Sequence, residues 1–81
     1  MKLHIGGEEE KDGWTIFNTQ KKTESNIIGD ICDLSQFKDD SIEEVYASHV
    51  LEHVRQIDVE NVLKGIQRIL KKNGKLYISV P

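Results

Sequence analysis

The stretch DVENVLKGIQRILKKNGKLYISVP, residues 58–81, decides the fold class of this chain. Its first part carries apolar side chains at the spacing of one face of an α-helix. These are Val59, Val62, Leu63, Ile66, Ile69 and Leu70. Asp58 is a good N-cap, and Asn73-Gly74 is typical of a helix end with glycine in the left-handed conformation. We therefore expect a helix over Asp58–Asn73 and a strand over Lys75–Val80, with Pro81 last.

The segment before this helix predicts another strand, Glu43–Ser48 (EEVYAS), so this half of the chain is strand, helix, strand. Two parallel strands need a connection of a dozen or more residues, and the expected helix supplies one. The pattern predicts an α/β domain with a mostly parallel sheet.

Three shorter strands are expected in the first half, over Lys2–Gly6, Trp14–Asn18 and Ile27–Ile31. The gap between Ile5 and Trp14 is too short for a crossover helix. Either an irregular loop joins the first two strands or their pairing is unusual, and the sequence leaves both open.

The length of 81 residues allows one domain at most, so we expect a single domain over residues 1–81. A net charge of −3, with Lys and Arg scattered, argues against nucleic acid as a partner. The lone Cys32 cannot form an internal disulfide, which favours a reducing compartment. No signal peptide and no apolar run of about 20 residues is visible, so we expect a cytoplasmic chain without a membrane partner.

Glycines and polar residues follow the expected strands at positions where parallel sheets bind ligands. Gly6-Gly7 follows the first strand, Asn18 ends the second, and Asp30 and Asp33 lie at or after the third. Taken alone, Gly6-Gly7 is equally compatible with an ordinary tight turn, and Asn18, Asp30 and Asp33 are better explained as ordinary polar loop residues.

The sequence His49–His53 (HVLEH) also matches H-x-x-E-H, an inverted zinc-protease motif. On a helix the two histidines would share a face and could bind zinc. No third ligand is evident, so we expect no metal site. The competing interpretation is a short helix packed through its apolar residues, with the histidines facing a cleft or solvent.

Taken together, five segments resemble the class I S-adenosylmethionine-dependent methyltransferases, in particular a small bacterial group described as predicted methyltransferases linked to glycan synthesis. The segments are KLHIGG (2–7), GW and FN (13–18), DICDL (30–34), EEVYASHVLEHV (43–54) and VLKGIQRILKKNGKLYISVP (62–81). The resemblance implies a Rossmann-like fold with strand order three-two-one-four-five and S-adenosylmethionine as the small-molecule cofactor.

The resemblance also implies roles for residues near the first two strands. Gly6 and Gly7, with His4 just before them, match the loop that holds the methionine part of the cofactor. Asn18 matches the ribose-binding position. Two residues depart from the family pattern: Glu8 replaces a glycine, where its side chain could block the cofactor, and Asn18 replaces a carboxylate, which makes stronger hydrogen bonds.

Further roles follow for the third and fourth strands. Asp33, with Leu34 beside it, matches the adenine-binding position. Ala47, Ser48 and His49 match the strand end that lies along the cofactor.

Methyl transfer needs mainly positioning, and His49 or His53 is the candidate general base on an acceptor that the sequence does not identify. The family domain continues beyond the fifth strand, whereas this sequence ends at Pro81. We therefore expect a domain truncated after the fifth strand, whose exposed apolar edge Lys75–Pro81 forms a homodimer. The alternative function is a degenerate, non-catalytic domain that acts as a dimeric interaction module.

Overall fold

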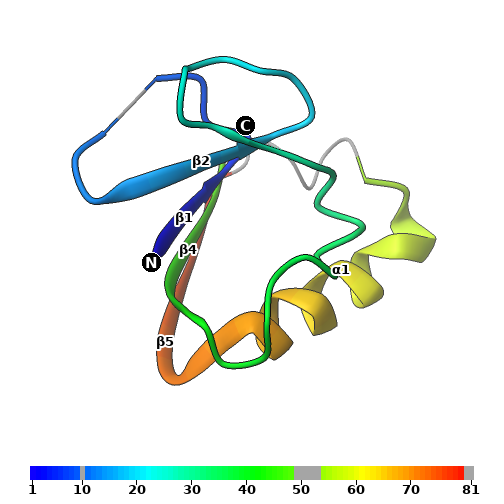
Figure 1. Cartoon of the computed structure of the whole chain (residues 1–81). Coiled ribbons are helices and arrows are strands. Elements are labelled where there is room, and N and C mark those ends of the chain that lie inside the picture. The colour runs from blue at the N-terminus through cyan, green and yellow to red at the C-terminus, as the bar shows by residue number, and fades with distance from the viewer. Residues whose placement is uncertain (10, 49–53, 80–81) are drawn as a thin grey trace.

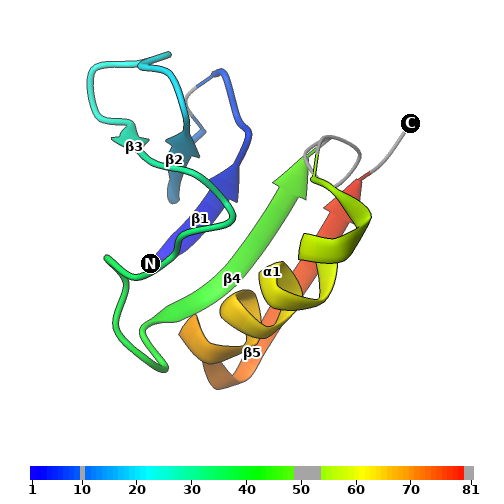
Figure 2. The ribbon, with the colours of Figure 1, turned by 90° about the vertical axis from the view of Figure 1, so that its right-hand side faces the viewer.

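The computed structural model describes residues 1–9, 11–48 and 54–79. Its elements are β1 (Lys2–Ile5), β2 (Trp14–Asn18), β3 (Ile27–Ile28), β4 (Ile42–Ser48), α1 (Gln56–Ile69) and β5 (Leu70–Ser79). The strands form one parallel sheet in the order β3-β2-β1-β4-β5 (Figures 1 and 2). The α/β class and the predicted strand order are confirmed.

The hydrophobic core lies on the face of the sheet that α1 covers. In Figure 2 the helix lies in front of β4 and β5, and the segment 29–41 continues this layer toward β1. Alternate residues of the strands point into the core, as the two-residue repeat of a strand requires. The core residues are Leu3, Ile5, Phe17, Ile31, Leu34, Phe37, Ile42, Val45, Val62, Ile66 and Ile69.

Arg68 fastens the segment 29–41 to the helix. Its guanidinium donates to the backbone oxygens of Leu34 (2.7 Å) and Phe37 (2.9 Å) and to Asp39 Oδ1 (2.7 Å). These bonds satisfy two carbonyl groups of a segment that has no regular structure of its own. Leu34 and Phe37 thereby stay in the core.

In the described part of the chain, no helix covers the opposite face of the sheet. Aromatic rings gather there: the ring centroid of His4 lies 4.9 Å from that of Tyr46 and 6.4 Å from that of Trp14. Beside them Lys2 Nζ lies 3.1 Å from Glu44 Oε2. Half-buried aromatic and paired charged side chains therefore form this face.

The connection between β1 and β2 settles the alternative left open above. The two strands are parallel and in register, with His4 opposite Ile16, and an irregular loop without a helix joins them. Two glycines with positive φ, Gly6 (83°) and Gly13 (85°), make the sharp changes of direction that this short connection needs.

The predicted helix ends were wrong. The helix begins after Arg55, and Asp58 lies in its first turn, where its Oδ2 accepts a bond from Arg55 Nε at 3.0 Å. The helix stops at Ile69, and Leu70 is already extended. Gly74 is not in the left-handed conformation that the Asn73-Gly74 pattern predicted.

The predicted start of the last strand was wrong for the same reason, because β5 begins at Leu70 and not at Lys75. Leu70 lies opposite Ile42, and Lys75 lies opposite Glu44, so the extra residues of β5 form a bulge. A Cβ atom on Gly74 would lie 2.9 Å from the backbone oxygen of Lys71. Gly74 is therefore needed for close backbone packing in a bulge.

Three other strand ends differ from the prediction. β3 stops at Ile28 because Gly29 turns against Phe17, where a Cβ atom would lie 2.5 Å from the ring. β1 stops at Ile5, before the left-handed Gly6. β4 starts one residue earlier than predicted, at Ile42.

Candidate functional site

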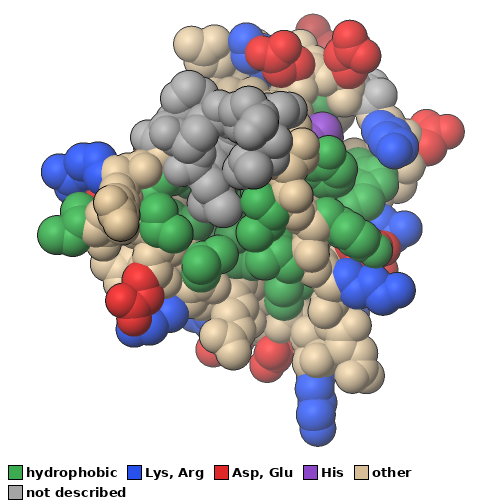
Figure 3. All heavy atoms as spheres, turned by 180° about the vertical axis from the view of Figure 1, so that it is seen from behind, with side chains coloured by type: hydrophobic (Ala, Val, Ile, Leu, Met, Phe, Trp, Pro, Cys, Tyr) green, Lys and Arg blue, Asp and Glu red, His purple; other side chains and the backbone are tan. Residues whose placement is uncertain are grey.

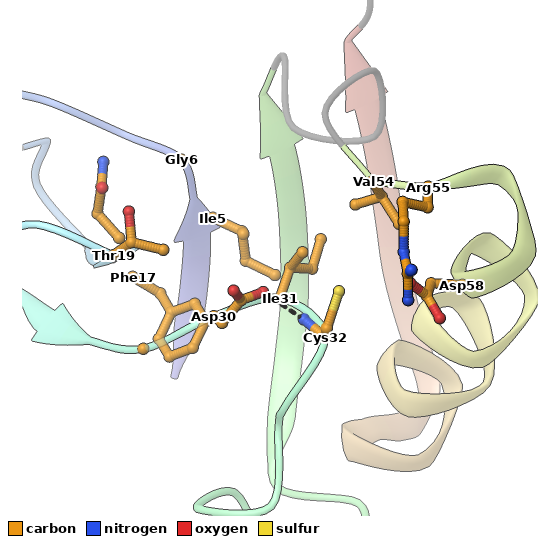
Figure 4. A pocket seen from close by; sticks show the side chains of 12 residues that line it. Ile5, Gly6, Phe17, Thr19, Asp30, Ile31, Cys32, Val54, Arg55 and Asp58 are labelled. Atoms are coloured by element: carbon orange, nitrogen blue, oxygen red, sulfur yellow. Dashed lines mark hydrogen bonds and ion pairs between the residues drawn. The ribbon is translucent and has the colours of Figure 1, made fainter.

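A cavity of about 440 Å³ opens where β1, β2 and β3 end. Figure 4 shows Asp30, Ile31 and Cys32 together in one loop, and Arg55 and Asp58 across from them at the start of α1. The lining residues are Ile5, Gly6, Phe17, Asn18, Thr19, Gly29, Asp30, Ile31, Cys32, Val54, Arg55 and Asp58. Ligands bind in this position, at the carboxyl ends of strands, in open parallel sheets.

The cavity combines apolar and polar walls. Ile5, Phe17 and Ile31 are core residues whose side chains also reach the cavity. Polar groups come from the strand ends and from the pair of Arg55 and Asp58. Such a mixture suits a ligand with a flat apolar part and several hydrogen-bonding groups.

Gly6 is one of the predicted site residues that the structure places in the cavity wall. Its φ of 83° turns the chain out of β1, and its N–H donates to Phe17 O at 2.8 Å. A residue without a side chain at this turn lets a ligand approach the backbone closely.

Asn18 is another predicted site residue in the cavity wall. Its Nδ2 donates to Gly7 O at 3.0 Å, and its Oδ1 accepts from Gln20 N at 3.0 Å. One amide hydrogen and one lone pair are not used by these two bonds and could meet a ligand hydroxyl. Asn18 thus holds the glycine loop in place as well as lining the cavity.

Of the two aspartates near the third strand, Asp30 and not Asp33 lines the cavity. Asp30 Oδ1 accepts a hydrogen bond from Cys32 N at 2.9 Å, and this bond does not use the other carboxylate oxygen of Asp30. Asp33 accepts from Ser35 N at 3.1 Å, and hydrogen bonds from Ser35 lower the pKa of its carboxyl. Leu34 beside it is buried in the core and does not line the cavity.

His4 and Gly7 also lie outside the cavity wall. A Cβ atom on Gly7 would lie 2.6 Å from His4 Nδ1, so the glycine makes room for the imidazole. Burial, and then the charge of Lys11, lower the pKa of His4. The buried Nε2 of His4 has no hydrogen-bond partner among the described residues. His4 is thus held in the aromatic face as a neutral ring.

Ala47 and Ser48 end β4 without lining the cavity. Ala47 is fully buried and pairs with Ile5 and Ile78. His49, His53 and the predicted short helix around them lie outside the described residues, and with them the zinc hypothesis and both candidate bases. Over residues 1–9, 11–48 and 54–79, no group of His, Cys, Asp and Glu could hold a metal ion.

Sequence reasoning missed the wall formed by the start of α1 and the residue Cys32. Asp58 had been interpreted only as a helix cap, although a helix that follows β4 must begin at the edge where the strands end. Partial desolvation, followed by the charge of Asp30, raises the pKa of the Cys32 thiol. The thiol is therefore not activated as a nucleophile here.

A family model described as a methyltransferase domain matches residues 12–78, which is most of the chain. The chain belongs to this methyltransferase domain family. The match covers β2 to β5 and begins after the Gly6-Gly7 loop. Neither a curated protein nor a solved structure matches the chain. Among the described helices, none has the length and apolar character needed to cross a membrane.

Proposed function

We propose that the chain binds S-adenosylmethionine in the cavity at the ends of β1, β2 and β3 and serves in methyl transfer to an acceptor. The observation that carries this proposal is the position of Gly6, Asn18 and Asp30 around one cavity in a member of the methyltransferase domain family.

The residues of the cavity fit the chemical parts of this cofactor. Phe17 and Ile31 offer apolar surface to an adenine ring, and Asp30 and Asn18 offer acceptors to ribose hydroxyls or an adenine amine. The carboxylate of Asp30 favours the cationic sulfonium and ammonium groups, whereas that of Asp58 is paired with Arg55 Nε at 3.0 Å. The cavity volume of about 440 Å³ lies within the range of small-molecule sites, about 300–1,000 Å³.

When bound, the cofactor supplies an electrophilic methyl group for an in-line displacement. The chain's own residues would bind and orient it, which is the main requirement of such a reaction. Glu8, which replaces the family's second glycine, is not a lining residue: its side chain is 70% exposed and lies 3.6 Å from Lys22 Nζ. His49 and His53 remain the candidate general bases that would remove a proton from the acceptor. The free, exposed thiol of Cys32 supports a reducing, cytoplasmic location.

Calorimetric titration with S-adenosylmethionine and S-adenosylhomocysteine tests the proposal, with dissociation constants expected in the micromolar range. The matched variants are Asp30→Asn and Asp33→Asn, because both aspartates accept a backbone bond but only Asp30 lines the cavity. Asp30→Asn should weaken binding at least about tenfold, since bonds to charged groups contribute about 1.5–3 kcal/mol. Asp33→Asn should bind like the original chain. No heat at millimolar ligand would exclude cofactor binding.

A second candidate function is a non-catalytic interaction module. It is supported by two observations: Asn18 stands where the family has a carboxylate, and the edge strand β5 exposes apolar side chains. The same titration separates the two functions, because a module without the cofactor would give no heat.

A further inference from the structure

The edge strand β5 exposes apolar side chains on both faces of the sheet. In the described sheet β5 pairs only with β4, so its other edge has no strand beside it. Leu76, Tyr77 and Ile78 keep 36%, 44% and 45% of their surface exposed. Figure 3 shows hydrophobic side chains gathered in the middle of the molecule seen from behind.

These three side chains point to different faces of the sheet. Leu76 and Ile78 pair with Val45 and Ala47 and therefore point to the side of α1, whereas Tyr77 pairs with Tyr46 on the opposite side. On the side of α1 the apolar surface continues into a hollow of about 730 Å³, which Leu63 and Leu76 line. The surface thus consists of a strand edge, a helix flank and a hollow between them.

We propose that a second copy of this chain covers this surface by antiparallel pairing of β5 with β5, about a two-fold axis at Tyr77. A two-fold axis perpendicular to the sheet places one residue opposite its own copy and keeps each face continuous. With Tyr77 on the axis, Leu76 lies opposite the partner's Ile78, and Lys75 lies opposite the partner's Ser79.

The charge pattern of β5 favours this register over its neighbours. An axis at Lys75 would place two ammonium groups opposite each other, which destabilises a strand pair. An axis at Leu76 would place Lys75 against the partner's Tyr77 and Gly74 against the partner's Ile78, with less apolar contact. An axis at Ile78 would pair Ile78 with its own copy and would place Tyr77 against the partner's Ser79. Counted over the described residues 70–79, only the axis at Tyr77 makes two apolar cross-strand pairs on the side of α1 and joins the tyrosines of both copies on the other.

The second copy also accounts for the hollow beside the helix. Because the faces stay continuous, the two α1 helices lie on the same side, and Leu63 of each copy approaches the pair of Leu76 and Ile78. No residue that lines the cofactor cavity belongs to β5. Failure of cofactor binding and failure of this dimer are therefore distinguishable.

Cysteine cross-linking of the full chain tests the register, with Cys32→Ser as the background. Tyr77→Cys should give a disulfide-linked dimer under mild oxidation, because paired positions across antiparallel strands lie within disulfide reach. Lys75→Cys and Ser79→Cys should not cross-link alone, but their equimolar mixture should. A dimer that cross-links at Ser79→Cys alone, or not at Tyr77→Cys, would overturn the proposal.

Light scattering of the original chain at about 10–100 µM is the second measurement, and we expect a dimer. Ile78→Lys should raise the dissociation constant at least tenfold, because it places a charge opposite the partner's Leu76. Ile57→Lys, at a position that is 78% exposed and belongs to α1 and not to β5, is the matched control and should stay dimeric. The proposal would be contradicted if the original chain were monomeric, or if Ile78→Lys formed a dimer with the same dissociation constant as the original chain. The first of these results does not depend on whether any variant folds.

Discussion

Arg68 shows how a single side chain can hold an irregular segment in place. Truncation by Arg68→Ala removes the donor of the Phe37 carbonyl at the edge of the core, whereas the Leu34 carbonyl keeps its bond from Phe37 N at 3.1 Å. We expect the free energy of unfolding to fall by about 1–3 kcal/mol, since one unsatisfied buried group costs about that much. Urea denaturation measures this change.

The control for Arg68 is Lys64→Ala on the same helix. Lys64 is exposed and makes one ion pair with Glu60 at 3.2 Å, of the kind that contributes about 0.3–0.5 kcal/mol. Equal losses for the two variants would show that the bonds of Arg68 to the segment 29–41 add nothing to stability.

His4 predicts how stability depends on pH. Because burial lowers its pKa in the folded chain, the unfolded chain binds more protons as the pH falls below about 6.5, and stability decreases there. The contribution of His4 is fully present above pH 6.5 and is lost as the pH falls through its lowered pKa. Asp33 and Glu44, whose pKa values are also lowered, act only below about pH 4–4.5.

Urea titrations between pH 5 and pH 7.5 test this prediction. The free energy of unfolding of the original chain should fall toward pH 5, and the fall should be smaller in His4→Gln, which removes the titrating group. The same slope in both proteins would mean that His4 is not responsible.

At the scale of elements, the two glycines Gly65 and Gly74 have opposite requirements. Gly65 lies inside α1, where an added Cβ atom would meet only Leu34 Cδ1 at 3.4 Å, an ordinary contact. Gly65→Ala should therefore stabilise the chain by about 0.5–1 kcal/mol. Gly74→Ala should destabilise it, because the new Cβ atom would lie 2.9 Å from Lys71 O. Thermal unfolding of both variants checks the two signs, and a destabilised Gly65→Ala would contradict the packing described for α1.

The sequence predicted the elements whose signal is local and failed where tertiary contacts decide. β2 has the predicted bounds, because WTIFN favours a strand by itself. The end of α1 was wrong, because pairing of Leu70 with Ile42 draws residues into β5 against the local helix-stop pattern. The local sequence does not predict such a pairing between residues far apart in the chain.

The candidate site divides in the same way. Strand ends were predictable, so Gly6 and Asn18 were found, and Asp30 was among the polar residues considered. Asp33 and Leu34 were chosen by family pattern, but the turn after Gly29 points Asp30 toward the cavity and sends Leu34 into the core. Arg55 was not predicted, because only the folded chain shows that the start of α1 lines the cavity.

At the scale of the whole molecule, one face of the sheet is covered by α1 and the segment 29–41, and the described edge β5 is open. A chain of 81 residues buries only about 60–68% of the surface that its unfolded form exposes, which makes its stability marginal. Burial at the proposed β5 interface would then add a large share of the total stability. Folding and dimer formation should be coupled by mass action.

This coupling predicts that the melting temperature depends on protein concentration. Between about 2 µM and 200 µM, the melting temperature of the original chain should rise by several degrees, because the folded dimer is favoured at higher concentration. Ile78→Lys should show a smaller rise over the same range, since its dimer is at least tenfold weaker. Ile57→Lys should follow the original chain. A melting temperature of the original chain that stays constant over this range would mean that β5 contributes no stability through a second copy, whatever the chain binds in its cavity.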